Sequence, residues 1–187
     1  MSVNFYFVRH GQSEANLKNE FYNDEESGLT NLGRMQAAEV GYELNRLAVD
    51  FDIIFCSPFK RARETCKIAL DKANLVNVPV VIDERIAERR FDGLVGTTAT
   101  KEHNSLLYHY DSNQAELDGV ETLYALENRA RGFIDSVIKK YPNSNVLVFS
   151  HGAFGLAFRA VIEGRPKSGN LFEFSLLRNG EIAKYET

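Results

Sequence analysis

Short apolar runs alternate along this chain with longer segments in which apolar residues recur at helical spacing. The runs predict strands at residues 3–8, 51–55, 78–82 and 146–149, and the composition of the first fits a buried strand. The recurring spacing predicts helices at residues 31–47, 57–73, 122–141 and 153–163, with a weaker case for 100–110. Alternating strands and helices favour an α/β fold, in which a largely parallel sheet is covered on both faces.

A helix cap at Thr30 and a turn near the C-terminus add detail to this fold. Thr30 stands where it can cap the helix predicted at 31–47. Near the C-terminus, apolar residues 171–177 and 182–185 flank Asn179-Gly180, a strong hairpin signal. The predicted architecture is therefore a three-layer α/β/α sandwich, with a largely parallel sheet and a C-terminal antiparallel hairpin.

Composition restricts the class of protein further. The chain has 187 residues and no repeat or linker, so we expect a single domain over residues 1–187. The formal net charge of −4 argues against a nucleic-acid partner, although a local basic pocket can still attract an anion. No apolar stretch approaches the ~20 residues of a membrane span, so no membrane partner is expected. The pattern leaves the oligomeric state open.

The cysteines and the N-terminus bear on location. Cys56 and Cys66 are the two cysteines, and the N-terminus lacks the features of a signal peptide. A disulfide framework is not expected, and a cytoplasmic location is the prediction. Neither cysteine belongs to a catalytic or metal-binding motif, so both are interpreted as buried small residues.

Two histidines stand at the exits of predicted strands. The triplet Arg9-His10-Gly11 follows the first strand, and residues 150–152 (Ser-His-Gly) end the fourth. Each histidine precedes a glycine, which would let the backbone approach a ligand closely. Ser57 also follows a strand, and ligands of parallel sheets bind beyond the carboxyl ends of strands. The sequence therefore predicts one site at this edge, and the arginine indicates an anionic ligand.

These residue types fit phosphoryl chemistry. A neutral imidazole of His10 can attack phosphorus and form a phosphohistidine. Arg9 and Arg61 offer forked donors that match phosphate oxygens, and the helix that begins near Ser57 would add partial positive charge. For Arg61 the alternative is a solvated basic helix face, because other basic residues lie nearby.

Other polar residues are less clearly selected. Glu88 is a candidate general acid, but its spacing alone does not distinguish it from a surface carboxylate paired with Arg85 or Arg89. Ser13 and Asn16 follow His10 and could donate hydrogen bonds to phosphate oxygens, or simply cap a short helix.

No metal-binding motif or Walker phosphate loop is present, and arginines beside His10 would repel a cation. We therefore expect neither metal nor cofactor.

Four segments resemble the histidine phosphatase superfamily, also called the phosphoglycerate mutase-like family. Residues 7–16 (FVRHGQSEAN) are similar to its N-terminal signature, and residues 29–37 (LTNLGRMQA) to the start of its first long helix. Residues 57–65 (SPFKRARET) resemble its second signature, and residues 145–152 (NVLVFSHG) its second-histidine strand. The segments occur in the family's order over nearly the whole chain.

The resemblance implies roles for individual residues. It implies a phosphohistidine at His10, with Arg9, Arg61 and His151 around the phosphate, and it selects Glu88 as the acid. The catalytic set is thus His10, Glu88, His151, Arg9 and Arg61. The expected phosphate-binding set is Arg9, His10, Ser13, Asn16, Arg61, His151 and Gly152.

The branch of the family is less directly indicated. Residues 88–96 (ERRFDGLVG) resemble the acid loop of the mutases, whereas Leu94 stands where phosphatases of the family often have tryptophan. The chain has no tryptophan and no arginine pair in 108–117, and Asp111, Glu116 and Asp118 make that region acidic. A mutase must retain a bisphosphate, which needs cationic groups.

We therefore predict a metal-independent phosphomonoesterase acting on a small phosphorylated metabolite. The alternatives are a cofactor-dependent phosphoglycerate mutase and a non-catalytic module that binds a phosphorylated ligand.

Overall fold

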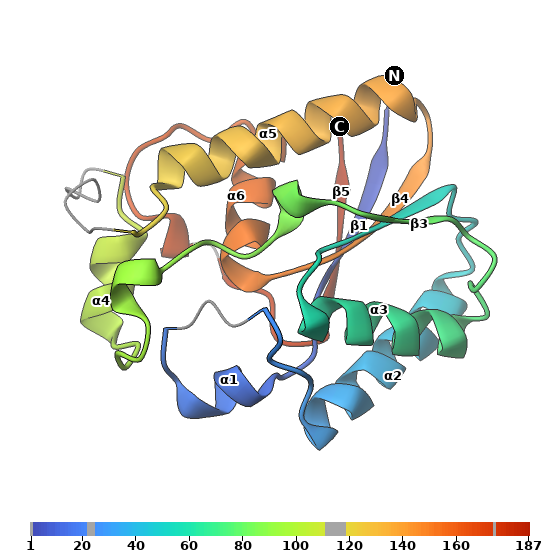
Figure 1. Ribbon diagram of the computed structural model, residues 1–187. Coiled ribbons are helices and arrows are strands. Elements are labelled where there is room, and N and C mark those ends of the chain that lie inside the picture. The colour runs from blue at the N-terminus through green and yellow to red at the C-terminus, as the bar shows by residue number, and fades with distance from the viewer. Residues whose placement is uncertain (1, 22–24, 111–118, 174) are drawn as a thin grey trace.

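The computed structural model describes residues 2–21, 25–110, 119–173 and 175–187 (Figure 1). Its described part contains a five-stranded sheet with the strand order β3-β2-β4-β1-β5. The strands are β1 (Asn4–Arg9), β2 (Ile53–Cys56), β3 (Val80–Ile82), β4 (Asn145–Ser150) and β5 (Ile182–Glu186). Strands β1 to β4 pair in parallel, and β5 runs antiparallel to β1. The predicted fold class is confirmed.

The C-terminal pairing differs from the predicted hairpin. Leu171–Glu173 forms a 3-10 turn rather than a strand, and β5 pairs with β1, with Phe7 opposite Ala183. The Asn179-Gly180 turn bonds to the end of β1, because the Gly180 N–H donates to the Arg9 carbonyl oxygen at 3.0 Å. Strand β1 would otherwise present an unpaired edge, and β5 covers it.

Helices cover both faces of the sheet, as Figure 1 shows. On one face lie α2 (Asn31–Leu47) and α3 (Lys60–Ala73); on the other lie α5 (Leu123–Lys140) and α6 (Gly152–Ile162). Two shorter helices, α1 (Glu14–Lys18) and α4 (Lys101–Leu107), lie toward the end of the molecule at which the parallel strands finish. Single 3-10 turns occur at Glu84–Ile86 and Asp92–Leu94.

The alternation of side chains along β1 explains the two cores. Phe5 and Phe7 pack into the cluster that contains α5 and α6, whereas Tyr6 and Val8 pack into the cluster with α2 and α3. Successive side chains of a strand point to opposite faces, so an entirely apolar strand needs a cover on each side. The central strands are therefore fixed from both faces, and their carboxyl ends are rigidly placed.

Helix α2 has the predicted bounds, but large apolar residues on it face solvent. Thr30 caps it by accepting a hydrogen bond from the Gly33 N–H, as predicted. The apolar residues that indicate the helix, including Met35 and Tyr42, are exposed. A Cβ added at Gly41 would lie 2.5 Å from the Ala69 carbonyl oxygen, so small residues let α2 lie close against α3.

No helix in the described part of the chain is long and apolar enough to cross a membrane.

Candidate active site

The carboxyl ends of three neighbouring parallel strands bring the predicted site residues together. His10 follows β1, Ser57 follows β2 and His151 follows β4. The ring centroids of His10 and His151 are 5.1 Å apart. The two histidines, 141 residues apart in the chain, thus meet at one edge of the sheet.

The contacts of His10 determine which ring nitrogen carries the proton. Its Nδ1 lies 2.7 Å from the Gly11 carbonyl oxygen, which can only accept, so Nδ1 is the protonated nitrogen. Its Nε2 accepts from the Nε–H of Arg61 at 3.3 Å, so Nε2 bears the lone pair. Burial, with the charges of Arg61 and Arg9, holds the pKa of His10 well below its ordinary value. The ring is therefore neutral, with Nε2 as its nucleophilic atom.

Gly11 allows a close approach between two backbone segments. A Cβ at this position would lie 2.3 Å from the carbonyl oxygen of Gly33, at the start of α2. A Cβ at Gly33 would in turn lie 2.0 Å from the Gln12 carbonyl oxygen. The two glycines allow the loop after β1 to touch the first turn of α2. The predicted approach of this backbone to a ligand stays a prediction.

Both arginines of the predicted phosphate clamp lie beside the histidines. Arg61 is 1% exposed and its guanidinium carbon lies 4.9 Å from the centroid of the Phe59 ring, so it does not belong to a solvated helix face. Arg9 donates from NH1 to the Leu177 carbonyl oxygen at 2.6 Å. A Cβ at Gly152 would lie 3.3 Å from the guanidinium carbon of Arg9, so this glycine leaves room for the arginine.

His151 is fully buried and contributes a nitrogen with an unused hydrogen-bonding position. Its Nε2 lies 2.7 Å from Ser57 Oγ, and its buried Nδ1 has no hydrogen-bond partner among the residues that the structure describes. Burial, followed by the charges of Arg61 and neighbouring groups, holds the pKa of His151 well below its ordinary value. Ser57 was not among the predicted site residues, although its position after a strand was a usable signal.

The Glu88 carboxylate is held by backbone amides rather than by an arginine side chain. Oε1 accepts from the Arg89 N–H at 2.9 Å and the Phe154 N–H at 3.0 Å, and Oε2 accepts from the Ala153 N–H at 3.3 Å. Two of these amides belong to the first turn of α6, whose cap residue, His151, makes no side-chain capping bond. First-turn amides have no partner within their own helix, and the helix dipole favours an anion there. The structure thus places Glu88 beside His151.

Comparison with known proteins assigns the family. The sequence model of the histidine phosphatase superfamily (branch 1) matches residues 5–187. The chain belongs to this superfamily. The resemblance seen in its motifs is thereby confirmed.

The relatives of this chain include a phosphatase and a mutase by name. A Hydrogenobacter thermophilus protein, whose name marks it as a candidate phosphoserine phosphatase, is 34% identical over 79% of this chain and 72% of its own length. A 2,3-bisphosphoglycerate-dependent phosphoglycerate mutase of Lactococcus lactis subsp. cremoris is 34% identical over 75% of this chain. The matched part covers 64% of the length of that mutase. A mutase of the same name from Brucella anthropi is matched over 47% of its own length.

The fold is shared with solved structures at lower identity. The structure of YhfR from Bacillus stearothermophilus superposes with a TM-score of 0.83 over 97% of this chain and 90% of the other, at 21% identity. This likeness concerns the fold alone.

Ser13 and Asn16 cap the short helix α1, which is the alternative that the sequence offered to phosphate binding. The Ser13 side chain accepts from the Asn16 N–H, and Asn16 Oδ1 accepts from the Ser13 N–H at 3.0 Å, which makes a capping box at α1. Asn16 Oδ1 also accepts from Asn179 Nδ2 at 3.3 Å. Ser13 is fully buried, whereas Asn16 lines the cavity described next. Their binding of phosphate stays a prediction.

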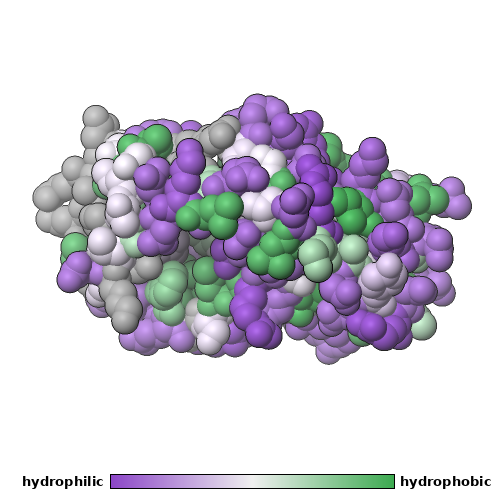
Figure 2. Space-filling model, turned by 90° about the horizontal axis from the view of Figure 1, so that it is seen from below, coloured by the Kyte–Doolittle hydropathy of each residue, from purple (hydrophilic) through white to green (hydrophobic). Residues whose placement is uncertain are grey.

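A cavity of about 220 Å³ opens above these residues. Its charged lining residues among those described are Arg9, Glu20, Arg61 and Glu88, and its aromatic ones are Phe21, Phe91, Tyr108 and Phe172. Figure 2 views the end of the molecule at which the parallel strands finish, where apolar residues gather between hydrophilic margins. Burial raises the pKa of Tyr108, and the nearby Glu88 carboxylate adds to this. The described lining of the cavity thus combines two arginines and two carboxylates with four aromatic side chains.

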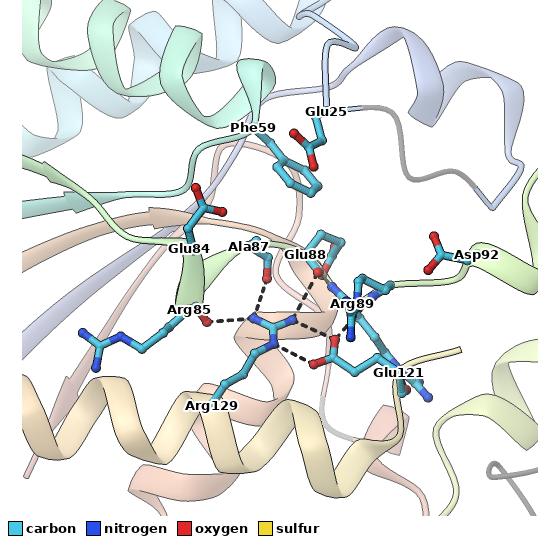
Figure 3. Close-up of a pocket in the computed structure, with 11 residues that line it drawn as sticks. Glu25, Phe59, Glu84, Arg85, Ala87, Glu88, Arg89, Asp92, Glu121 and Arg129 are labelled. Atoms are coloured by element: carbon cyan, nitrogen blue, oxygen red, sulfur yellow. Dashed lines mark hydrogen bonds and ion pairs between the residues drawn. The ribbon is translucent and has the colours of Figure 1, made fainter. Parts of the chain in front are cut away.

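Glu88 also lines a second, larger cavity, of about 590 Å³, together with Phe59 and Arg129 (Figure 3). Arg129 and Glu121 lie at its base and contact the backbone beside Glu88. Sequence reasoning selected neither residue, because no motif or spacing links them to Glu88.

Proposed function

We propose that this protein is a metal-independent phosphomonoesterase that hydrolyses a small phosphorylated metabolite through a phosphohistidine on His10. The observation that carries the proposal is the buried, neutral His10 ring, whose Nε2 accepts from Arg61 at 3.3 Å and whose ring centroid lies 5.1 Å from that of His151. A module that merely binds a phosphorylated ligand needs neither a nucleophile nor an acid.

In the first step, His10 Nε2 attacks phosphorus and the bond from phosphorus to the ester oxygen breaks. Arg9 and Arg61 stabilise the charge on the transferring phosphoryl oxygens, and His151 binds one of them through Nδ1. A phosphate dianion near His151 favours protonation of that ring, which supplies the proton on Nδ1. Ser57 holds the other ring nitrogen and so sets the orientation of His151.

Glu88 enters the first step in its protonated form and donates that proton to the leaving alcohol. A carboxylate offers about four lone-pair sites, and the three amide bonds occupy three of them. The remaining site is on Oε2, which we assign as the atom that carries the transferred proton. In the second step Glu88 Oε2 takes a proton from water, the water oxygen attacks phosphorus, and the bond to His10 Nε2 breaks. Inorganic phosphate leaves and both side chains return to their starting states.

The charges of the cavity support hydrolysis over phosphoglycerate mutation. Its described lining holds two cations, Arg9 and Arg61, and both are used by the transferring phosphate. A bisphosphate and a carboxylate would need further cations, and Glu20 offers an anion instead. The acidic residues of segment 111–118, on which the sequence argument also relied, lie outside the described residues.

The deciding experiment runs two assays on one preparation. Phosphate release is measured with sugar phosphates, nucleotides, phosphoglycerates, phosphoserine and phosphopeptides, and mutase activity with 3-phosphoglycerate and a trace of 2,3-bisphosphoglycerate. His10→Asn, which keeps an N–H donor for the Gly11 carbonyl, is the control for contaminating phosphatase. We expect phosphate release that depends on His10. Formation of 2-phosphoglycerate faster than release of phosphate from every substrate would establish the mutase instead.

A further inference from the structure

The backbone that carries Glu88 follows the 3-10 turn Glu84–Ile86 and then has no regular structure, and three carbonyl groups of residues 85–88 turn toward α5. The carbonyl oxygens of Arg85, Ala87 and Glu88 point at the side chain of Arg129 on that helix (Figure 3). Buried carbonyl groups need partners, and a segment outside helices and strands must find them in side chains. The position of Glu88 therefore depends on what α5 provides.

Arg129 provides all five of its N–H donors to this region. NH1 donates to the carbonyl oxygens of Arg85 and Ala87, each at 2.7 Å, and NH2 donates to that of Glu88 at 3.1 Å. The two remaining donors bind the Glu121 carboxylate, from Nε at 2.7 Å and from NH2 at 3.0 Å. A guanidinium has five donors in a rigid fork, so each one is matched and the plane of the group is fixed.

The same guanidinium also contacts the residue that holds the other end of Glu88. Its carbon lies 5.1 Å from the centroid of the Phe154 ring, and the Phe154 N–H donates to Glu88 Oε1. Glu121 adds a further link, because its Oε2 accepts from the Arg90 N–H at 3.3 Å. Arg129 thus touches both the backbone of Glu88 and the residue that binds the Glu88 carboxylate.

A purely structural role accounts poorly for this pair. The side chains of Arg129 and Glu121 are 20% and 6% exposed, and removing such charges from water costs energy that apolar residues of similar size would not. Apolar residues would not supply the hydrogen bonds to the carbonyl groups of Arg85, Ala87 and Glu88.

We propose that Arg129, oriented by Glu121, is a positioning residue that keeps Glu88 Oε2 within hydrogen-bonding distance of the leaving oxygen of the substrate. This inference rests on the proposed role of Glu88 as the general acid. Loss of the hydrogen bonds from Arg129 lets residues 85–88 shift. Proton donation by Glu88 then weakens, while attack by His10 is retained.

The test compares two substrates that differ in their need for a proton. An alkyl phosphate needs protonation of its leaving oxygen, whereas p-nitrophenyl phosphate needs little. The ratio of kcat/KM for the two, measured on one preparation, does not depend on the fraction of enzyme that is folded. We expect Arg129→Met to lower the alkyl-to-aryl ratio about tenfold or more, as part of the roughly 10²–10⁴-fold that general acids contribute. Arg129→Lys keeps the charge but not the fork, so it should lower the ratio by less.

Arg85→Gln is the matched control. The Arg85 side chain also joins this segment to α5, through the Gly132 carbonyl and Ser136 Oγ, but it makes no bond to Glu88. Its loss should leave the ratio unchanged. An equal fall in Arg85→Gln, or an unchanged ratio in both Arg129 variants, would overturn the positioning role.

Glu88→Gln separates this inference from the function on which it rests. A lower ratio in Glu88→Gln with unchanged ratios in the Arg129 variants overturns the positioning role alone. An unchanged ratio in Glu88→Gln overturns the assignment of Glu88 as the acid, and the inference with it.

Discussion

The two buried histidines should make the fold sensitive to mild acid. Both are fully buried and neutral, and their pKa values are lowered well below 6.5 by burial and by arginine charges. In the unfolded chain each ring titrates at its ordinary value of 6.5. As the pH falls through 6.5 the unfolded chain therefore takes up protons that the folded protein does not. Stability is fully present above this pH and is lost below it.

The magnitude follows from this difference in proton uptake. Each histidine costs about 1.36 kcal/mol per pH unit below 6.5, so lowering the pH to about 5 costs roughly 2 kcal/mol per ring. For His10 and His151 together the loss is about 4 kcal/mol, a large share of the 5–15 kcal/mol typical of a domain. The loss ends where the folded-state pKa values are reached.

Urea unfolding at several pH values between about 5 and 7.5 measures the effect. His10→Asn removes one titrating ring, so its free energy of unfolding should fall by about 2 kcal/mol less than that of the wild type over this range. Because the wild type and His10→Asn carry the same carboxylates, comparing their free energies of unfolding at each pH cancels the carboxylate contribution. If the two proteins lost stability in parallel, His10 would not be buried as a neutral ring.

Three further predictions concern backbone packing, the thiols and metal independence. Gly33→Ala should destabilise by about 1–3 kcal/mol and reduce activity, because its Cβ would lie 2.0 Å from the Gln12 carbonyl oxygen. The control Gly132→Ala places its Cβ in open space, so it should stabilise the protein by roughly 0.5–1 kcal/mol. Thermal unfolding of the two variants checks this prediction, and equal shifts in Tm would contradict it. The hydrogen bond to Cys66, with burial, raises the pKa of Cys56, so alkylation of the native protein should be far slower than after denaturation. Full activity after dialysis against EDTA is expected, because arginines supply the charge that a metal would; a loss restored by a divalent ion would refute this.

Local signals predicted most of the elements and the largely parallel sheet, but not the partner of the last strand. The bounds of α2 follow from the Thr30 cap and from helical spacing. The spacing could not show which face is buried, because the close approach to α3 depends on glycine and alanine rather than on large apolar residues. The antiparallel partner of β5 was also beyond local reasoning, since β1 lies far away in the chain.

The site residues also differ in how far local sequence signals predicted them. His10, Arg61 and His151 stand in motifs at the ends of secondary-structure elements, and the topology brings them together. Glu88 needed a resemblance to be selected, because its partners on α6 lie 65 and 66 residues away. Arg129 had no local signal, since its role arises from carbonyl groups that only the folded backbone presents to it.

The phosphohistidine itself is the most direct test of the account. The enzyme is mixed with p-nitrophenyl phosphate, quenched within milliseconds under alkaline conditions that preserve phosphohistidine, digested and mapped by mass spectrometry. The account predicts phosphate on His10 in the wild-type enzyme, and neither phosphate nor turnover in His10→Asn. Turnover by a wild-type enzyme that carries no phosphate on His10, or substantial turnover by His10→Asn, would contradict it.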